Sequence, residues 1–373
     1  MYIVLAILVF GLIVAIHELG HFFAAKAFKI GVVEYAIGMG PMLFGKRIGE
    51  TVYSLRAIPF GGYCAMYGEE SLEAGDKGKE DKEKNKETKQ KKPKVEFKKD
   101  WTSDRSYNSK APWKRILVLL AGPFANLVLG FVMIFTSITL WGSFGPLTIK
   151  EVKPDTPAYE AGIEANDLIT KINNRNVLTY NDFFEYKLSH PSVNTEGYTL
   201  TVERNGESKE FFVVPDPETE IIGIIINTEV EKKSFPDIIK YSFNDMKYWI
   251  VTVFDSIGML INGDATAKDL SGAIGITDMM GDTMKEASDY GSLAVIETIM
   301  TLIAFISINL GIMNLLPFPA LDGGRIAFTS IELLTRKKIP VKIEFAVNAV
   351  GMLCLMGLMI FTLFNDVIRI IFN

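Results

Sequence analysis

The feature that most constrains this chain is an apolar run near its start that contains ionisable residues. Residues 3–25 are almost entirely apolar, and a helix of that length spans the hydrocarbon core of a bilayer. Within the run the sequence reads His17-Glu18-Leu19-Gly20-His21, which holds two of the chain's three histidines. Ionisable side chains at membrane depth are costly and mark functional sites. We therefore interpret the run as a functional transmembrane helix, against the alternative that the motif arises by chance or is structural.

The spacing of this motif suits a metal ion. On a helix His17 and His21 are one turn apart and share a face, so their imidazoles can hold one zinc ion. Glu18 can polarise a zinc-bound water, whose pKa zinc lowers to about 7, and serve as the general base in hydrolysis of a peptide bond. A catalytic zinc takes three protein ligands. Asp322 is the best third ligand, because it lies in a Pro- and Gly-rich helix break at the edge of a later apolar run; the alternative is that it only caps a helix.

Three further apolar runs indicate a multi-pass membrane protein. The chain of 373 residues is 49% hydrophobic, with the apolar residues gathered in long runs. The first run has no basic segment before it and no small-residue cleavage site after it, so we expect a retained helix rather than a signal peptide. We predict a polytopic α-helical membrane protein with about four transmembrane helices, over residues 3–25, 116–141, 293–316 and 343–364.

The segments between these runs differ in character. Residues 51–67 are rich in β-formers, which predicts a short membrane-associated β-hairpin after a Gly/Pro turn or loop at residues 38–41. Residues 72–100 are charged and nearly devoid of apolar side chains, the composition of a disordered insertion. Residues 235–262 form an amphipathic helical pattern, which fits a helix at the membrane interface or a packed linker helix.

Residues 145–229 have the composition of a soluble α+β domain. Residues 157–163 followed by 166–169 show the helix, turn and strand order of a PDZ domain. Such domains bind an extended peptide as an added strand at a sheet edge. We therefore expect one inserted PDZ domain, with peptide binding as a possible activity of its own.

The predicted divisions of the chain follow these segments. They are 1–70 for the first helix and the hairpin, 71–100 for the charged insertion, 101–141 for the second helix, 145–229 for the PDZ domain, 235–292 for the interfacial helix and a loop, and 293–373 for the third and fourth helices.

The orientation in the membrane follows from the basic residues. Lys and Arg favour cytoplasmic loops, and they gather between the first and second runs and between the third and fourth. This places His17, His21 and Asp322 near the cytoplasmic side of the cell membrane. The PDZ domain is then extracytoplasmic.

Several motifs together resemble one protease family. They are His-Glu-Leu-Gly-His in the first run, Leu-Asp-Gly after Asn-Leu-Leu-Pro-Phe-Pro-Ala, the Gly-Met-Gly-Pro segment, and a single PDZ-like domain between the second and third runs. This set resembles the site-2 protease family of intramembrane zinc metalloproteases, and within it the bacterial regulator-of-sigma-E proteases. The resemblance covers nearly the whole chain apart from residues 72–100. It implies a bound Zn²⁺ on His17, His21 and Asp322, with Glu18 catalytic.

The resemblance also implies substrates and contacts. The expected substrates are single-span membrane proteins cut in or near the transmembrane segment, such as an anti-sigma factor already shortened by a first protease, or remnant signal peptides. Asn314 is expected to position the substrate backbone, and residues 51–63 to clamp it as a strand, with Tyr53, Leu55 and Ala57 as candidate contacts. The PDZ domain is expected to restrict substrates by size. The best-known members carry two PDZ domains, whereas this chain shows one. Membrane lipid is an expected partner, and nucleic acid is not.

Two functions of other classes compete with this interpretation. An inactive PDZ membrane adaptor would not need Glu18, because a purely structural zinc requires no base. A metal transporter predicts acidic residues or histidines in several spans, whereas here they lie in the first span and at Asp322.

Overall fold

The computed structural model describes residues 2–69, 101–190, 193–263 and 273–372, and the chain divides into two compact units. The first unit contains residues 1–130 and 270–373, and the second contains residues 131–269. The predicted charged insertion at 72–100 lies outside the described residues. The long helix α3 (Pro112–Trp141) contributes residues to both units.

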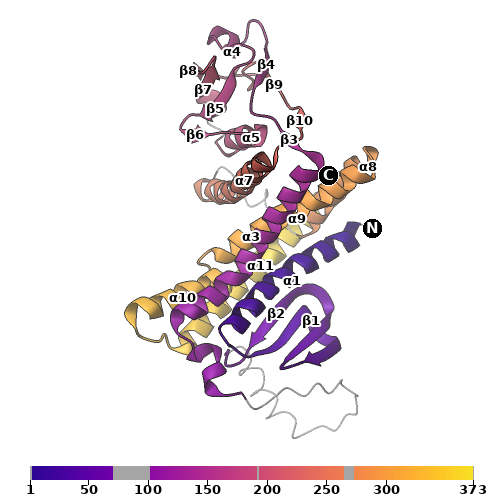
Figure 1. Cartoon of the computed structure of the whole chain (residues 1–373), viewed down its shortest axis with the longest axis vertical. Coiled ribbons are helices and arrows are strands. Elements are labelled where there is room, and N and C mark those ends of the chain that lie inside the picture. The colour runs from indigo at the N-terminus through magenta and orange to yellow at the C-terminus, as the bar shows by residue number, and fades with distance from the viewer. Residues whose placement is uncertain (1, 70–100, 191–192, 264–272, 373) are drawn as a thin grey trace. The chain divides into compact units, whose positions relative to one another are not determined.

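The first unit is mostly helical, with four helices that are long and apolar enough to cross a membrane among the residues described. Its elements are α1 (Tyr2–Ala27), β1 (Val32–Ile48), β2 (Thr51–Met66), η1 (Ser103–Arg105), η2 (Tyr107–Ser109), α3, α8 (Ala273–Asp289), α9 (Ser292–Leu315), α10 (Asp322–Thr335) and α11 (Val341–Phe372). The four candidate spans lie in α1, α3, α9 and α11, which confirms the runs predicted from the sequence. Figure 1 shows the long helices of this unit with the β1–β2 sheet beside α1.

Small residues bring the helices of the first unit together. A Cβ placed on Gly20 of α1 would lie 2.2 Å from the carbonyl oxygen of Ala121 on α3, so the two helices cross with backbone nearly in contact. Pro123 lies inside α3, where it leaves the Leu119 carbonyl without its helical N–H partner.

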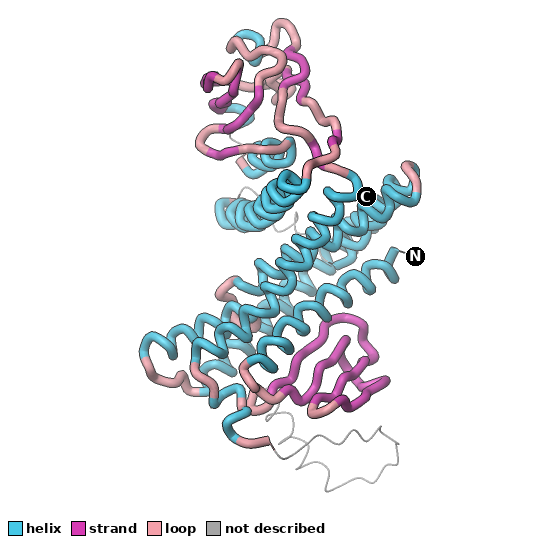
Figure 2. Tube along the Cα trace, in the orientation of Figure 1, coloured by secondary structure: helices cyan, strands magenta, loops and turns pink. Residues whose placement is uncertain are grey.

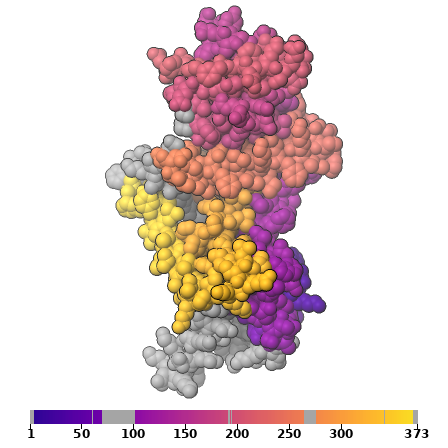
Figure 3. All heavy atoms as spheres, turned by 90° about the vertical axis from the view of Figure 1, so that its left-hand side faces the viewer, coloured from indigo at the N-terminus to yellow at the C-terminus, as the bar shows by residue number. Residues whose placement is uncertain are grey.

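The candidate span in α11 is much more exposed than the others. It is only 6% buried, and the yellow helix forms part of the surface in Figure 3. Its exposed apolar side chains suit contact with lipid.

The β1–β2 sheet is larger than the predicted hairpin. Residues 32–37 pair with 62–66 on one side and with 52–55 on the other, and residues 44–48 form the hairpin with 51–55. Residues 38–41, predicted as a turn or loop, lie within β1, where Gly38 and Gly40 adopt positive φ angles of 85° and 81° and the pairing register shifts. Glycine tolerates these angles, so one long strand bends there without ending.

Buried apolar side chains join the sheet to the end of α1. This cluster comprises Phe22, Ala25, Ile30, Val32, Tyr35, Cys64, Met66, Tyr107 and Val118. The Tyr35 hydroxyl also donates a hydrogen bond of 2.7 Å to the carbonyl oxygen of Ala15 on α1. The sheet is therefore fixed against the helical turns that contain the His-Glu motif.

The second unit combines small sheets with short helices, seen as magenta and cyan tube in Figure 2. Its elements after α3 are β3 (Ser143–Phe144), β4 (Ile149–Val152), α4 (Pro157–Glu160), β5 (Leu168–Ile172), β6 (Arg175–Asn176), α5 (Tyr180–Ser189), α6 (Val193–Glu196), β7 (Tyr198–Arg204), β8 (Glu207–Val213), β9 (Ile224–Ile226), β10 (Val230–Glu231) and α7 (Phe235–Asn262). The sheets have the strand orders β6-β5-β7-β8, β4-β9 and β10-β3. Their buried centre includes Ile169, Ile172, Tyr198 and Leu200.

The helix α7 matches the amphipathic segment predicted at 235–262. It packs against α5, where the Asn244 amide donates to Asp182 at 3.0 Å, and against β6, where Arg175 lies 3.0 Å from Asp255. These contacts support the packed-helix alternative. The segment after α7 was predicted as a loop up to residue 292, but α8 occupies residues 273–289 and packs against α9 in the first unit.

Candidate metal centre

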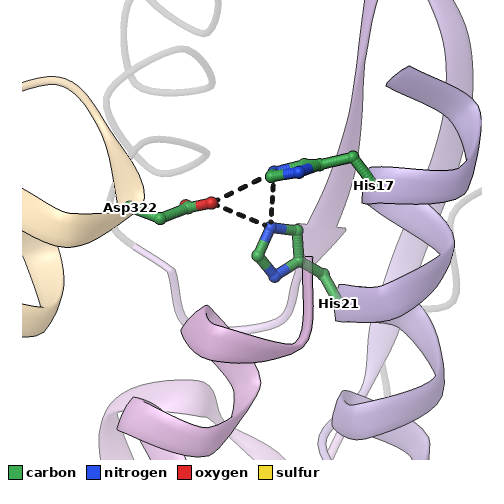
Figure 4. Close-up of side chains that lie close together, drawn as sticks. All are labelled: His17, His21 and Asp322. Atoms are coloured by element: carbon green, nitrogen blue, oxygen red, sulfur yellow. Dashed lines mark hydrogen bonds and ion pairs between the residues drawn. The ribbon is translucent and has the colours of Figure 1, made fainter. Parts of the chain in front are cut away.

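Three side chains converge in the first unit as the sequence predicted. His17 and His21 project from one face of α1, and Asp322 is the first residue of α10 (Figure 4). His17 Nε2 and His21 Nε2 lie 3.0 and 3.3 Å from Asp322 Oδ2, and 3.1 Å from each other. All three side chains are largely buried.

The spacing of these three atoms fits a zinc ion. Ligands about 2.0–2.1 Å from a tetrahedral zinc lie about 3.3 Å apart, close to the separations in this triangle. Two neutral imidazoles and one carboxylate are also a donor set that zinc uses in catalytic sites, where a fourth position stays open. Among the described residues, this is the group of histidine, cysteine or acidic side chains close enough to hold a metal ion.

The helix α3 closes one side of the centre without supplying a ligand. A Cβ added to Gly122 would lie 2.3 Å from His21 Nε2 and 2.8 Å from His17 Nε2, so only glycine leaves room for the imidazoles. On the same helix the Val118 carbonyl accepts a hydrogen bond of 2.8 Å from His21 Nδ1. That bond leaves Nε2 of His21 as the free ligand nitrogen.

The surroundings of Asn126 fit a metal on His17. Its side-chain amide nitrogen lies 3.3 Å from His17 Nδ1, the residue is fully buried, and its Oδ1 has no hydrogen-bond partner in the described part of the chain. A metal on Nε2 puts the imidazole hydrogen on Nδ1, which then needs an acceptor. Exchanging the positions of the Asn126 amide oxygen and nitrogen lets Oδ1 accept that hydrogen. Which of the two atoms faces the His17 ring is assigned from the hydrogen bonds that each can make. The orphaned oxygen thus fits a metal-loaded His17.

Glu18 shares a cavity with the three ligand residues. The cavity has a volume of about 390 Å³ and is bordered on one side by the end of β2. The backbone of Cys64, in β2, hydrogen-bonds the Glu18 carboxylate. The lining residues are His17, Glu18, His21, Tyr63, Cys64, Ala65, Met66, Glu69, Leu119, Asp322 and Arg325. A carboxylate and three potential metal ligands around one cavity can support hydrolysis.

Other predicted site residues lie elsewhere in the first unit. Asn314 is near the end of α9 and does not line the cavity, and neither do Tyr53, Leu55 and Ala57 on β2. The third histidine, His190, belongs to the second unit, where its ring stacks on Tyr186.

Sequence reasoning did not single out the cavity residues at the end of the predicted hairpin and just after it, although the predicted clamp at 51–63 includes Tyr63. Tyr63–Met66 and Glu69 come from the end of β2 and the turn after it. Arg325 carried a signal, because it follows Asp322 by three residues and so shares its face of a helix. Gly122 and Leu119 carried none beyond the small-residue composition of their run.

Comparison with known proteins agrees with this geometry. The model of Peptidase family M50 matches residues 5–358. A putative zinc metalloprotease of Clostridium perfringens is 36% identical over 99% of both chains. The probable protease eep of Enterococcus faecalis is 31% identical over 99% of both chains, and the zinc metalloprotease RasP of Geobacillus kaustophilus is 30% identical over 97% of this chain and 96% of its own. The chain therefore belongs to peptidase family M50, the zinc metalloproteases of the site-2 protease type.

Proposed function

We propose that this chain cleaves single-span membrane proteins within or beside their transmembrane segment, with Glu18 as the general base. The observation that carries the proposal is the cavity that Glu18 shares with His17, His21 and Asp322, built on a candidate membrane span. A spanning helix places this chemistry at the depth where a transmembrane substrate lies.

Each residue of the centre has a defined task in this proposal. His17, His21 and Asp322 hold the zinc, which when bound polarises a carbonyl oxygen and makes water a better acid. Glu18 takes the proton from the attacking water and delivers it to the amine that leaves when the peptide bond breaks. The Cys64 backbone holds the Glu18 carboxylate in place by a hydrogen bond. The surrounding burial excludes bulk water from the ligands.

The substrate is proposed to bind as an added strand at the edge of β2. Residues 62–66 pair with 32–37 on one side, and no strand among the described residues pairs on the other. Four of these five residues line the cavity. The backbone groups of Cys64 and Met66 already bond the carboxylates of Glu18 and Glu69, so an extended peptide pairs with the donors and acceptors that remain at this edge, which delivers an unwound segment to Glu18.

This proposal moves the docking site of the substrate backbone from the clamp predicted at residues 51–63 to the edge at residues 62–66. Tyr53 and Leu55 have strand partners on both sides, in residues 34–37 and 44–48, so their backbone groups are already used. Any contact from Tyr53 or Leu55 must then come from the side chain, whereas Ala57 has no strand partner in this register and keeps its backbone groups as candidate contacts. Asn314 keeps its predicted role of positioning substrate backbone, from the break that follows α9.

The second unit is proposed to be the PDZ domain that restricts substrates. Its four-stranded sheet, short helices and buried centre agree with the α+β character expected of such a domain. A spanning α3 has its ends on opposite sides of the membrane, and the metal centre contacts its first turns, near Val118 and Gly122. We propose that this end is cytoplasmic, because basic residues cluster there, and that the second unit is extracytoplasmic. The resemblance suggests a pre-shortened anti-sigma factor or remnant signal peptides as substrates.

The experiment uses the full chain purified in detergent and loaded with zinc. Single-span model proteins with short ectodomains serve as substrates, and zinc per chain is measured alongside cleavage. Glu18→Gln should retain one zinc per chain and lose cleavage, because the ligands remain while the proton acceptor is gone. His17→Ala should lose both. Cleavage by Glu18→Gln at the wild-type rate would remove Glu18 from the proposed role.

A further inference from the structure

One face of α10 carries polar side chains that all turn toward the rest of the first unit. Asp322, Arg325, Thr329 and Glu332 follow at intervals of three, four and three residues, the spacing of a single helix face. Asp322 reaches the metal centre, Arg325 pairs with Glu69, and Glu332 pairs with Arg115 on α3. Apolar residues Ile331, Leu333 and Leu334 are exposed instead. The polar face therefore sets how α10 sits against its neighbours.

Glu69 connects this face to the end of β2. Its Oε1 lies 2.6 Å from Arg325 Nη2, and its Oε2 accepts the backbone N–H of Met66 at 3.3 Å. Met66 is the last residue of β2 and lines the cavity together with Glu69 and Arg325. One carboxylate thus joins the proposed docking edge to the helix that begins with Asp322.

The surroundings make this ion pair hard to replace. Glu69 is only 9% exposed, and a buried carboxylate that loses its partner is strongly destabilised. The Arg325 guanidinium also lies over the ring of Tyr107, 5.7 Å from its centre, which limits where that side chain can move. The Tyr107 backbone N–H donates to the carbonyl of Tyr67 at 2.7 Å, two residues before Glu69. Tyr107 therefore restrains both members of the pair: its ring lies against Arg325, and its backbone N–H bonds the chain just before Glu69.

We propose that Glu69 and Arg325 are positioning residues, which fix the distance between the docking edge at residues 62–66 and the ligand Asp322. The inference rests on the proposed function, because only that function makes residues 62–66 an edge to which a substrate docks. A substrate strand bound to the edge meets Glu18 and the metal in register only while α10 and β2 keep this spacing. Neither residue needs to touch the substrate for this effect.

The test is a double-mutant cycle on the zinc-loaded full chain. The variants are Glu69→Gln, Arg325→Met and the two combined, with Glu332→Gln as the matched control from the other ion pair of α10. We expect each single variant to lower kcat/KM about 10- to 100-fold, as loss of support around a metal ligand does. Because both act through one contact, the double variant should be no worse than the poorer single variant. Glu332→Gln breaks the ion pair at the far end of α10, so it should lower stability but leave the kcat/KM of the folded protein within about twofold of wild type.

Two further measurements do not depend on activity. In the zinc-free chain, amide hydrogen exchange at residues 62–66 should become faster in Arg325→Met and Glu69→Gln but not in Glu332→Gln. Zinc loss to a chelator should also be faster in the first two. Arg325→Lys keeps both the positive charge beside Glu69 and the carboxylate that accepts the Met66 N–H, so it should show slower amide exchange than Arg325→Met if the latter folds poorly.

The outcomes separate the inference from the proposed function. Additive losses in the cycle, with unchanged amide exchange, would show that Arg325 acts on the substrate directly and overturn the pairing. Wild-type behaviour of both single variants would also overturn it. If the wild-type chain cleaves no single-span substrate, the proposed function fails, and the exchange comparison alone still decides whether the pair positions the edge.

Discussion

Replacing Gly122 by alanine should damage the metal centre from a residue that binds no metal. Gly122 lies on α3, and an added Cβ would be 2.3 Å from His21 Nε2 and 2.8 Å from His17 Nε2. Favourable nonbonded contacts between heavy atoms are about 3.5–4.0 Å. The methyl group and the His21 ring must therefore separate by about 1 Å.

The size of the effect follows from this overlap. Forcing an extra methyl group into a packed interior costs about 1–3 kcal/mol. Metal–ligand distances are expected within about 0.2 Å of their usual values, so a 1 Å displacement of His21 cannot be absorbed without loss of a ligand. If the cost falls on the bound state, zinc affinity drops about 5- to 150-fold, since 1.4 kcal/mol corresponds to a factor of ten.

Competition with a chromophoric zinc chelator measures this change directly. Wild type and Gly122→Ala are compared in the same detergent, with size-exclusion profiles to confirm folding. The matched control is Gly357→Ala on α11, because a Cβ there meets nothing within 4 Å. It adds the same methyl group to another apolar helix and should leave zinc affinity unchanged.

One result would refute the reasoning. A folded Gly122→Ala protein that binds zinc within twofold of wild type would show that α3 can move away without disturbing the imidazoles. The close packing of α3 would then be incidental to the metal centre. An equal loss in Gly357→Ala would point to a general effect of added methyl groups on this membrane protein.

Three other predictions address the neighbours of the centre and the second unit. Asn126→Leu should lower zinc affinity about 10- to 100-fold in a chelator titration, whereas Asn126→Asp should keep an acceptor for His17 and bind zinc more tightly than the leucine variant. Burial and the nearby Asp255 carboxylate raise the pKa of Glu185 to about 7, above its ordinary value of 4.5. The folded unit then binds more protons than the unfolded chain between those values, so its stability should fall as pH rises from about 4.5 to 7, and Glu185→Gln should flatten that dependence in thermal unfolding. Replacing residues 147–228 by a flexible linker should permit cleavage of substrates that keep their ectodomain, while shortened substrates remain cleavable in the same assay.

The candidate spans and the convergence of the proposed metal ligands were predictable because their signals are local or independent of partners. A run of about 20 apolar residues specifies a candidate span by length alone. His17 and His21 lie on one helix face by their spacing, and in the structure the Nε2 atoms of both lie within 3.3 Å of Asp322 Oδ2. Asp322 needed the additional argument that zinc requires a third ligand. Pro317 and Pro319 gave its local setting, since α9 ends at Leu315 before them.

The sheet was harder to predict because its pairing is not local. Residues 38–41 contain two glycines and a proline, which indicate a turn in sequence, yet β1 continues through them with a change of register. The identity of the free edge depends on which segment pairs with residues 32–37 on each side. Cross-strand partners decide that order, and no periodicity within residues 51–67 reports it. For the same reason, the contact between Glu69 and Arg325 could not be foreseen, although the position of Arg325 one turn after Asp322 could.

Different helices supply the proposed metal ligands and hold those ligands in place. The proposed ligands come from α1 and α10, but α3 contacts both histidines through Val118, Gly122 and Asn126. A metal site needs its ligands held within a few tenths of an ångström, which side chains on two separate helices cannot ensure alone. Backbone packing at Gly122 and two hydrogen bonds to the imidazoles supply that restraint without adding a charge within these candidate spans. A carboxylate in the place of Asn126 could also orient His17, but its charge would be costly to bury at this depth, which gives a physical reason for a neutral amide.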